Sequence, residues 1–390
     1  MYNDDFFRLE MQKIKELGLY REIRKIEKIE GKYINIAGKS YIDFSSNNYL
    51  GLRDDKRIIL SGKEAAEKYG AGSGASRVVT GNSSICSRLE EKIAQFRGKD
   101  TALVFNSRYD ANIAIFSSIF DESDIIFADK LIHASIIDGI KLSGAKLLRY
   151  KHNDIADLKI KMAKYSSKYK KIGVVTESVF SMDGDIGKIK EISDLKKIEN
   201  FIFIVDEAHA TGIFGERGSG VIEELGLEKN NVDVIMGTLG KALGSYGAYI
   251  AADSIIVEFL INRARPFIFS TALPPFSCGA ALKAIELIME KKVLTEKLYE
   301  NIMFARKNAE SSGFALPKDI TPIVPLIIGS NSEVVKLQKL IFDNGYVAAG
   351  IRPPTVPEGK SRIRLTINPY HDREDIEGLF KVVHSFIKEK

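Results

Sequence analysis

Short runs of hydrophobic residues alternate with longer amphipathic stretches from Thr101 to Asp253. Each run is about five residues long, as expected for a buried strand, and the stretches between runs have the periodicity of amphipathic helices. The pattern predicts an α/β fold with a mostly parallel central sheet flanked by helices. The predicted strands are TALVF (101–105), DIIFAD (124–129), AKLLRY (145–150), KIGVVTE (171–177), FIFIVDE (201–207), DVIMG (233–237) and GAYIAAD (247–253).

The two ends of the chain have other patterns. Residues 1 to about 30 predict one or two amphipathic helices, broken near Gly18, and 31–44 predict a hairpin that turns at Ala37 and Gly38. A helix over about 277–312 is predicted to lead into a smaller region of strands and helices. The expected domains are a helical arm with a hairpin (1–45), a large α/β domain (46–275) and a small α+β domain (276–390).

Composition and charge narrow the class of protein. The 390 residues are 45% hydrophobic and 28% charged, which is ordinary for a globular protein, and no apolar run approaches the roughly 20 residues of a membrane span. The first residues, MYNDDFFRLE, lack the apolar core of a secretory signal. Cys86 and Cys278 are the only cysteines, so neither a disulfide framework nor a Cys-rich metal site is expected. These features predict a cytoplasmic protein, and the mixed charges (net +5) do not indicate nucleic-acid binding.

One lysine stands out in the segment VDVIMGTLGKALGSY (232–246). A predicted strand ends near Met236, a polar turn with Thr238 follows, and Lys241 precedes a stretch with helical character. A lysine in such a turn can form an imine with a carbonyl, and Thr238 with nearby backbone N–H groups suits a phosphate. A solvated or salt-bridged lysine is the alternative that this segment alone leaves open.

An acid and a histidine lie upstream, in FIFIVDEAHA (201–210). Asp206 stands at the carboxyl end of a predicted strand, where open α/β sheets bind ligands, and His209 follows three positions later. Asp206 alone could be a helix N-cap, and His209 alone could be an interior histidine. Together with Lys241, however, they match the needs of pyridoxal phosphate (PLP): a carboxylate for the pyridine nitrogen, a lysine for the aldehyde and a histidine near the ring.

Three further residues lie next to predicted strand ends. Arg108 and Tyr109 follow TALVF where a helix is expected to begin, and helix N-termini bind phosphate. His133 follows another strand end and could stack on a heteroaromatic ring, although the segment alone favours a core or surface histidine.

Two arginines, Arg362 and Arg364, alternate along a predicted strand and therefore share a face. An arginine fork is well shaped to bind a carboxylate through two hydrogen bonds. Each arginine could instead form an ordinary salt bridge.

The chain resembles the α-oxoamine synthases, a family of PLP enzymes of fold type I, nearly from end to end. The segments that carry the resemblance are FSSNNYLGL (44–52), GSGASR (72–77), HAS (133–135), TESVFSMDGD (176–185), VDEAHATGIFGERGSG (205–220), TLGKALG (238–244), FSTALPP (269–275) and IRPPTVP (351–357). The resemblance implies a fold type I transferase with a smaller C-terminal domain and a homodimer with shared active sites.

The resemblance also assigns residues to the cofactor PLP. They are, in chain order, Arg108, Tyr109, His133, Ser181, Asp206, His209, Thr238, Lys241 and Thr271, of which His133, Asp206, His209 and Lys241 are the expected catalytic residues. Lys241 would form the Schiff base, Asp206 would pair with the ring nitrogen, and His133 would stack on the ring. His209 and Ser181 would bond near the ring oxygen. The Thr238 hydroxyl and the backbone of Arg108 and Tyr109 would hold the phosphate, while Thr271 would reach into the neighbouring subunit's site.

Four residues are assigned to substrates by the same resemblance. Arg364 would bind the amino-acid carboxylate, Arg21 and Thr355 would contact the acyl substrate, and Asn47 would reach into the neighbouring subunit's site. One departure concerns Arg108, because the family usually has glycine there. The arginine adds a cation near the phosphate and changes what the start of the helix must accommodate.

Within the family, IRPPTVP favours the reaction of biotin biosynthesis in which L-alanine condenses with a pimeloyl thioester and carbon dioxide is lost. The acyl carrier, CoA or an acyl carrier protein, is left open. Glycine C-acetyltransferase (2-amino-3-oxobutyrate CoA ligase) is the nearest alternative, and a synthase with a long acyl donor, such as serine palmitoyltransferase, is a weaker one. A non-catalytic partner subunit with the same fold is a remote alternative, since such a subunit is expected to lack the Schiff-base lysine.

Overall fold

The structure is a computed structural model that describes residues 4–227 and 229–388. The chain forms two compact units, which are described separately. The first, called the sheet unit, consists of Leu52–Phe180 and Ile186–Val293. The second, called the terminal unit, consists of Met1–Gly51, Ser181–Asp185 and Leu294–Lys390. The domain boundaries expected from the sequence remain a prediction.

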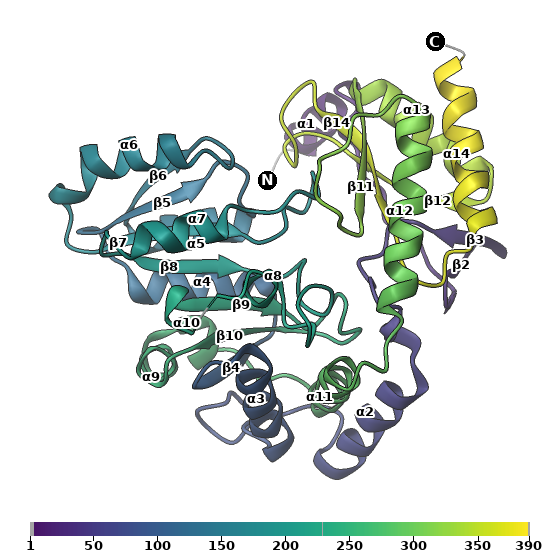
Figure 1. The fold of residues 1–390 in the computed structure, drawn as a ribbon. Coiled ribbons are helices and arrows are strands. Elements are labelled where there is room, and N and C mark those ends of the chain that lie inside the picture. Colours follow the sequence, from purple (N-terminus) through teal and green to yellow (C-terminus); the bar gives the residue numbers. More distant parts are fainter. Residues whose placement is uncertain (1–3, 228, 389–390) are drawn as a thin grey trace. The chain divides into compact units, whose positions relative to one another are not determined.

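All seven predicted strands are present in the sheet unit, in one sheet of order β4-β10-β9-β8-β7-β5-β6 (Figure 1). The pairs from β9 to β6 are parallel, whereas β10 runs antiparallel to both β4 and β9. The parallel strands therefore end at one edge of the sheet, which is where such sheets bind ligands. The strands are β4 (Thr101–Phe105), β5 (Ile125–Asp129), β6 (Lys146–Tyr150), β7 (Ile172–Glu177), β8 (Ile202–Asp206), β9 (Val234–Thr238) and β10 (Ala248–Ala252).

Helices flank this sheet, and apolar residues of α4, α5 and α9 pack on its strands in one continuous core. The helices are α2 (Lys56–Tyr69), α3 (Ser84–Arg97), α4 (Arg108–Ile119), α5 (Ala134–Ser143), α6 (Ile155–Tyr165), α7 (Ile189–Lys196), α8 (Val221–Glu224), α9 (Ser254–Arg263), α10 (Arg265–Ile268) and α11 (Pro275–Met289), with single 3₁₀ turns η1 (Leu52–Asp54), η2 (Ser166–Lys168) and η3 (Lys229–Asn231). The resulting α/β arrangement is the one predicted.

The terminal unit contains two small sheets, of order β1-β2-β3-β12 and β11-β14-β13. The predicted hairpin joins β2 to β3 through Ala37 and Gly38, whose φ angles of 50° and 74° suit the tight turns of two-residue hairpins. The elements are α1 (Asp4–Glu16), β1 (Lys28–Glu30), β2 (Tyr33–Ile36), β3 (Lys39–Asp43), α12 (Thr295–Ser311), β11 (Ile323–Gly329), α13 (Asn331–Asp343), β12 (Tyr346–Val347), β13 (Ala349–Ile351), β14 (Ser361–Thr366) and α14 (Arg373–Lys388).

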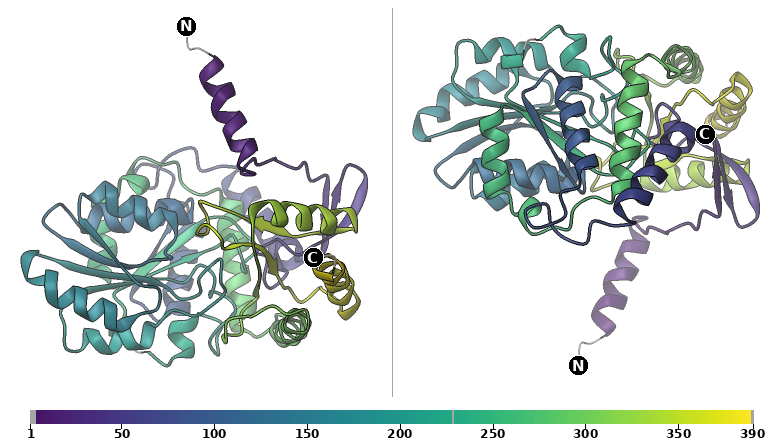
Figure 2. Two further views of the ribbon diagram at one scale, coloured as in Figure 1. Left: turned by 90° about the horizontal axis from the view of Figure 1, so that it is seen from above. Right: turned by 90° about the horizontal axis from the view of Figure 1, so that it is seen from below.

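One helix prediction is decided by the structure, and another differs from it. Of the one or two helices expected near the N-terminus, the described residues contain one, α1, and the chain from 19 to 27 has no helix; Figure 2 shows α1 joined to β1 by an extended segment. The single helix expected over 277–312 is two helices, α11 and α12, because the backbone turns between them at Lys291, whose φ is 55°. A positive φ is incompatible with a continuous right-handed helix.

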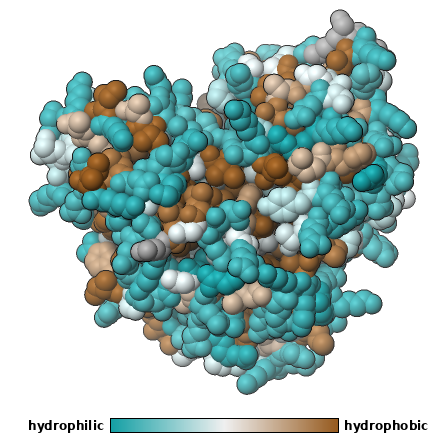
Figure 3. All heavy atoms as spheres, in the orientation of Figure 1, coloured by the Kyte–Doolittle hydropathy of each residue, from teal (hydrophilic) through white to brown (hydrophobic). Residues whose placement is uncertain are grey.

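Hydrophilic residues cover much of the face of the protein drawn in Figure 3, with hydrophobic residues gathered in places between them. Among the described residues, no helix combines the length and the apolar character that a membrane crossing requires.

Candidate active site

Two buried acids lie side by side where β7 and β8 end. Glu177 is the last residue of β7 and Asp206 the last of β8, and the two are paired in the parallel register. Their exposures are only 1% and 2%. The sequence analysis singled out Asp206, whose position at the end of a central strand is as predicted. Two carboxylates this close and this buried require a cation, because burial strongly disfavours unpaired charge.

Lys241 lies in the turn that follows β9. The strand extends to Thr238, two residues beyond the end expected from the sequence. The helical stretch expected after Lys241 is absent: residues 239–246 form a turn in which the Gly244 N–H donates to the Lys241 carbonyl (3.0 Å). Gly244 has a φ of 63°, and a Cβ there would lie 2.5 Å from the backbone nitrogen of Arg53, so η1 packs directly against this turn. The glycine therefore fixes where the lysine emerges.

His209 meets this lysine. The Lys241 Nζ lies 2.9 Å from His209 Nε2, and the two residues are 32 positions apart in the chain. Asp206 ends β8, and His209 lies three residues further along the chain. Between them, the Ala208 N–H donates to Asp206 Oδ1 (3.0 Å). The structure thus brings the predicted lysine and histidine into direct contact, beside the strand that ends in the predicted acid.

The side chain of Arg108 reaches both buried acids. Its Nε and Nη2 lie 2.8 and 2.7 Å from Asp206 Oδ2, and Nη2 lies 2.9 Å from Glu177 Oε2. Asn112, one turn further along α4, donates to the same Asp206 oxygen (3.2 Å) and to the Ser135 hydroxyl (2.9 Å). Arg108 was expected to act through its backbone, and this side-chain contact with Asp206 was not foreseen from the sequence.

His133 is the N-cap of α5 and contacts Glu177, one of the two buried acids. Its backbone N–H donates to Glu177 Oε1 (2.5 Å), and its Nδ1 lies 2.7 Å from the Ser135 hydroxyl. Burial lowers the pKa of His133 to about 4, and the charges of Arg108 and Lys241 contribute to the shift. Burial also raises the pKa of Glu177 to about 7, with Arg108 opposing the rise and Asp206 adding to it.

The predicted phosphate ligands surround the start of α4 and the end of β9. The Ser107 side chain caps α4 by accepting from the Asp110 N–H (3.0 Å), and helix geometry leaves the first N–H groups, of Arg108 and Tyr109, without intrahelical partners. The Tyr109 ring is 45% exposed and its hydroxyl bonds to Asp138 of α5. Thr238 is buried and donates to the Gly247 carbonyl (3.1 Å).

Thr271 is exposed, and its backbone pairs with Ser76 in an isolated β-bridge. The glycine-rich segment around Ser76 is thereby attached to the segment after α10, and Asn106 donates to the Thr271 carbonyl (2.9 Å). The predicted role of Thr271 toward a neighbouring subunit remains a prediction.

The terminal unit contains a second cluster of predicted residues, centred on Arg364. This guanidinium is buried and donates to the Ser181 carbonyl (2.5 Å), to Asn47 Oδ1 (3.1 Å), to the Thr366 hydroxyl and to the Tyr49 hydroxyl. All four acceptors are neutral, and no carboxylate within the described residues forms an ion pair with Arg364. The neighbouring Arg362 differs, since its Nη1 lies 2.6 Å from Asp183 Oδ1.

Arg21 and Thr355, the predicted acyl-substrate contacts, are both exposed in the terminal unit. The Thr355 N–H donates to the Arg352 carbonyl (3.1 Å), and the charge of Arg21 contributes to a lowered pKa of Arg352, whose main cause is burial. The Arg352 side chain also donates to the carbonyls of Gly18 and Tyr20. Arg352 thus bonds to Thr355 and to the residue that precedes Arg21.

A buried network behind Asp206 was not predicted. Arg97 forms an ion pair with Glu207, and it donates to the hydroxyls of Thr211 (2.6 Å) and Tyr249 (2.7 Å). Gly237 makes room for this network, because a Cβ there would lie 2.2 Å from the Tyr249 hydroxyl. Asn112 and Tyr49 were also absent from the predicted site, and they have no signal in the sequence. Glu177 carries the same signal as Asp206, an acid at a strand end, which makes it a candidate for reaching a ligand.

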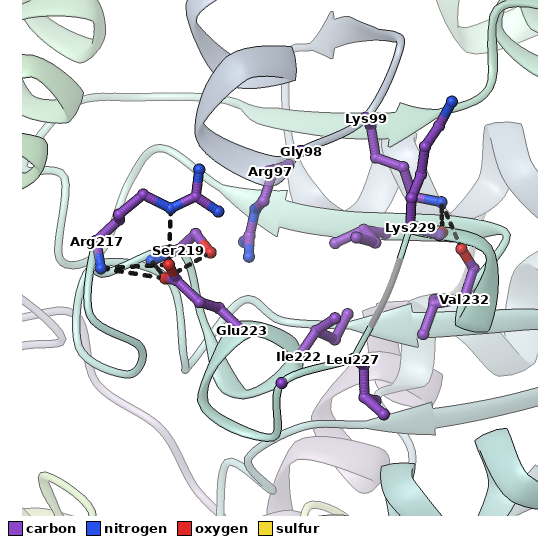
Figure 4. A pocket seen from close by; sticks show the side chains of 12 residues that line it. Arg97, Gly98, Lys99, Arg217, Ser219, Ile222, Glu223, Leu227, Lys229 and Val232 are labelled. Atoms are coloured by element: carbon purple, nitrogen blue, oxygen red, sulfur yellow. Dashed lines mark hydrogen bonds and ion pairs between the residues drawn. The ribbon is translucent and has the colours of Figure 1, made fainter.

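A cavity of about 380 Å³ lies close to this network, near η3 and the start of β9 (Figure 4). Its cations are bonded: Lys99 donates to the carbonyls of Lys229 (2.6 Å) and Val232 (2.5 Å), and Arg217 pairs with Glu223 (2.7 Å). Its lining does not include Lys241, His209 or Asp206.

Comparison with known proteins identifies the family. The model of the family "Aminotransferase class I and II" matches residues 39–383. The chain belongs to this family. The match covers most of both units and confirms the fold type I resemblance drawn from the sequence.

Relatives with similar sequences extend over almost the entire chain. The 8-amino-7-oxononanoate synthase of Thermoanaerobacter pseudethanolicus is 40% identical over 377 residues, which are 97% of this chain and 95% of that protein. The 8-amino-7-oxononanoate synthase of Geobacter sulfurreducens is 41% identical over 370 residues, 94% of each chain.

Solved structures agree on the fold. A high-resolution structure of SPT (serine palmitoyltransferase) with a PLP internal aldimine has a TM-score of 0.91 at 29% identity, covering 99% of this chain and 97% of that chain. The crystal structure of 8-amino-7-oxononanoate synthase from Francisella tularensis has a TM-score of 0.77 at 32% identity, covering 90% of this chain and 98% of that one.

Proposed function

We propose that the protein is an 8-amino-7-oxononanoate synthase, a PLP-dependent acyltransferase that condenses L-alanine with a pimeloyl thioester and releases carbon dioxide. The observation that carries the proposal is the contact of Lys241 Nζ with His209 Nε2 (2.9 Å), beside the strand that ends in the buried Asp206. Relatives named for this activity, at 40% and 41% identity over nearly the whole chain, support the same function.

The residues of the sheet unit fit PLP in kind and in placement. A pyridine nitrogen that must stay protonated needs a carboxylate, which Asp206 provides at 2% exposure, and an aldehyde needs an amine, which Lys241 provides. A phosphate needs N–H donors, and Arg108 and Tyr109 supply two at the start of α4. One side chain, that of Arg108, holds the carboxylate that the ring nitrogen would require.

When bound, PLP supplies an electron sink for negative charge at the α-carbon of an amino acid. The chain's own residues then have to move and hold protons. Lys241, in contact with His209, is proposed to take the proton from the α-carbon and to return it as general base and acid. His133, with a pKa lowered to about 4 by burial, is neutral at pH 7 and can therefore stack on a flat ring without adding charge.

The amino-acid substrate is proposed to bind Arg364 through its carboxylate. This buried cation has only neutral acceptors around it, so an incoming carboxylate would supply the charge that the described part of the chain does not. Arg21 and Thr355 are proposed to contact the acyl chain, carried by CoA or by an acyl carrier protein.

The active form is proposed to be a cytoplasmic homodimer in which Thr271 and Asn47 contribute to the neighbouring subunit's site. The exposure of Thr271 is compatible with that role. Asn47 bonds to Arg364 of its own chain, which supports a role for Asn47 beside the carboxylate that Arg364 is proposed to bind.

A second candidate is condensation of serine with a long acyl thioester, and the TM-score of 0.91 with SPT is the observation that favours it. The substrates of a glycine C-acetyltransferase, glycine and acetyl-CoA, are a third combination on the same scaffold. The identity of 29% with SPT, against 40% and 41% with the named relatives, places the alanine reaction first.

The deciding experiment pairs alanine, glycine, serine and threonine with pimeloyl, acetyl and palmitoyl thioesters and measures thiol release. We expect alanine with a pimeloyl thioester to be the most efficient pair, by a factor of at least roughly ten in kcat/KM, which corresponds to one well-placed specific contact. The product should have the mass of 8-amino-7-oxononanoate. If glycine with acetyl-CoA or serine with palmitoyl-CoA reacts faster, the proposal is wrong.

A further inference from the structure

Arg108 bridges the two buried acids at the strand ends. Its side chain is 10% exposed, and its guanidinium contacts Asp206 through two nitrogens and Glu177 through one. A guanidinium stays protonated at all ordinary pH values, so this bridge is a fixed positive charge. It compensates two carboxylates that lie side by side in the register of β7 and β8.

Donors of the chain occupy most of the acceptor positions of the Asp206 carboxylate. An ionised carboxylate accepts at about four positions. Asp206 Oδ1 accepts from the Ala208 N–H (3.0 Å), and Oδ2 accepts from Asn112 (3.2 Å) and faces both Nε and Nη2 of Arg108. A protonated ring nitrogen that pairs with Asp206 is therefore a second cation at a carboxylate that Arg108 already compensates, and the two like charges disfavour each other there.

Arg108 is the donor that can leave. The Ala208 N–H belongs to the backbone directly after β8, and Asn112 is also held by the Ser135 hydroxyl (2.9 Å). The Arg108 Nη2, by contrast, is buried and lies 2.7 Å from Asp206 Oδ2 and 2.9 Å from Glu177 Oε2 without the geometry of a hydrogen bond to either. A long side chain with an imperfectly bonded end moves at lower cost than a backbone amide or a doubly held asparagine.

We propose that Arg108 competes with the cofactor's ring nitrogen for the Asp206 carboxylate, so that Arg108 weakens cofactor binding for as long as it holds Asp206. This inference rests on the proposed PLP cofactor. Arg108 acts as a positioning residue: before uptake it supplies the positive charge between Asp206 and Glu177, and after uptake the ring nitrogen supplies the charge at Asp206. Two consequences follow. Compared with a variant that has a neutral residue at position 108, the wild type should bind the cofactor more weakly, and it should be more stable without the cofactor.

The test is a PLP titration of the full-length protein and of Arg108→Met, which removes the charge and keeps most of the side-chain volume. We expect the Kd for PLP to fall by roughly tenfold or more in the variant, the factor that one charge-assisted hydrogen bond represents. Without PLP the variant should melt at a lower temperature than the wild type, and PLP should raise its melting temperature by more. The proposal would be overturned if Arg108→Met bound PLP no more tightly than the wild type and PLP raised the melting temperatures of both proteins equally. If the Met variant does not fold, Arg108→Gly permits the same comparison.

Lys99→Met is the matched control, because Lys99 is a buried cation of the same unit whose bonds go to the carbonyls of Lys229 and Val232 (Figure 4). It should lower the melting temperature with and without PLP, while the Kd for PLP stays within about twofold, as for independent sites. If the wild type binds PLP and Arg108→Met binds it equally, only the Arg108 proposal fails. If neither protein binds PLP, the proposed function fails with it.

Discussion

Arg362 and Arg364 lie two positions apart on β14 and carry the same charge, yet their surroundings give them different roles. Arg362 is paired with Asp183 (2.6 Å), so its charge is already compensated. Arg364 is surrounded by the Ser181 carbonyl, Asn47 and two hydroxyls, all neutral. A buried guanidinium without an acid is poised to bind one, which makes Arg364 the better candidate for the substrate carboxylate.

Replacing Arg364 with Met should therefore weaken alanine binding. We expect KM for alanine to rise by roughly tenfold to a hundredfold, because one or two charge-assisted hydrogen bonds are lost. The affinity for PLP should change little, since PLP is proposed to bind in the sheet unit. Steady-state kinetics with varied alanine measures the effect, and Arg362→Met is the comparison. A larger rise in KM for Arg362→Met than for Arg364→Met would contradict the assignment.

The sequence was sufficient to predict that the central candidate residues follow strand ends, but not which contacts they make. Asp206 and Lys241 could be found because each follows an apolar run, and the contact of Lys241 with His209 agrees with the combined reading. The bridge made by Arg108 could not be found. It depends on Glu177 and Asp206, which are 69 and 98 positions away in the chain and meet Arg108 only through the order of the sheet.

At the scale of elements, the packing of α4 against α5 positions several site residues at once. Arg108 and Asn112 belong to α4, and His133 caps α5. The helices approach closely at Gly139, where a Cβ would lie 2.9 Å from the Asn112 carbonyl oxygen and 3.2 Å from Phe116 Cβ. Because the obstacle includes backbone, a larger residue at 139 must push the helices apart.

Gly139→Val should lower the free energy of unfolding by about 1–3 kcal/mol, the usual cost of overpacking a well-filled contact. Urea denaturation followed by circular dichroism measures this loss. Gly72→Ala serves as the control, because a Cβ at Gly72 meets no atom within 4 Å, and it should change stability by no more than about 0.5 kcal/mol. Equal stabilities of the two variants would show that α4 and α5 have room to spare.

Strands were easier to predict than helix boundaries. The seven apolar runs all became strands, because a strand buried on both faces leaves a continuous hydrophobic signal. The stretch after Lys241 is instead a turn, since Gly244 adopts a positive φ against η1. The residues of this stretch favour a helix locally, but tertiary packing determines a turn instead.

At the scale of the whole molecule, each of the two units is built from segments that are not continuous in the sequence. Residues Ser181–Asp185 belong to the terminal unit although sheet-unit residues precede and follow them. The sequence analysis assigned this loop to the large domain, because nothing in its composition marks a change. Ser181 and Asp183 within it bond to Arg364 and Arg362, which lie about 180 positions further on, and such long-range contacts leave no local pattern.

The central claim is that Lys241 is the residue to which the cofactor binds covalently. Borohydride treatment of the protein incubated with PLP, followed by peptide mass spectrometry, tests it directly, with Lys241→Ala as the matched variant. We expect a single pyridoxyl-modified peptide that contains Lys241, and neither this modification nor thiol release in the variant. Modification of a different lysine, or thiol release by Lys241→Ala near the wild-type rate, would contradict the account.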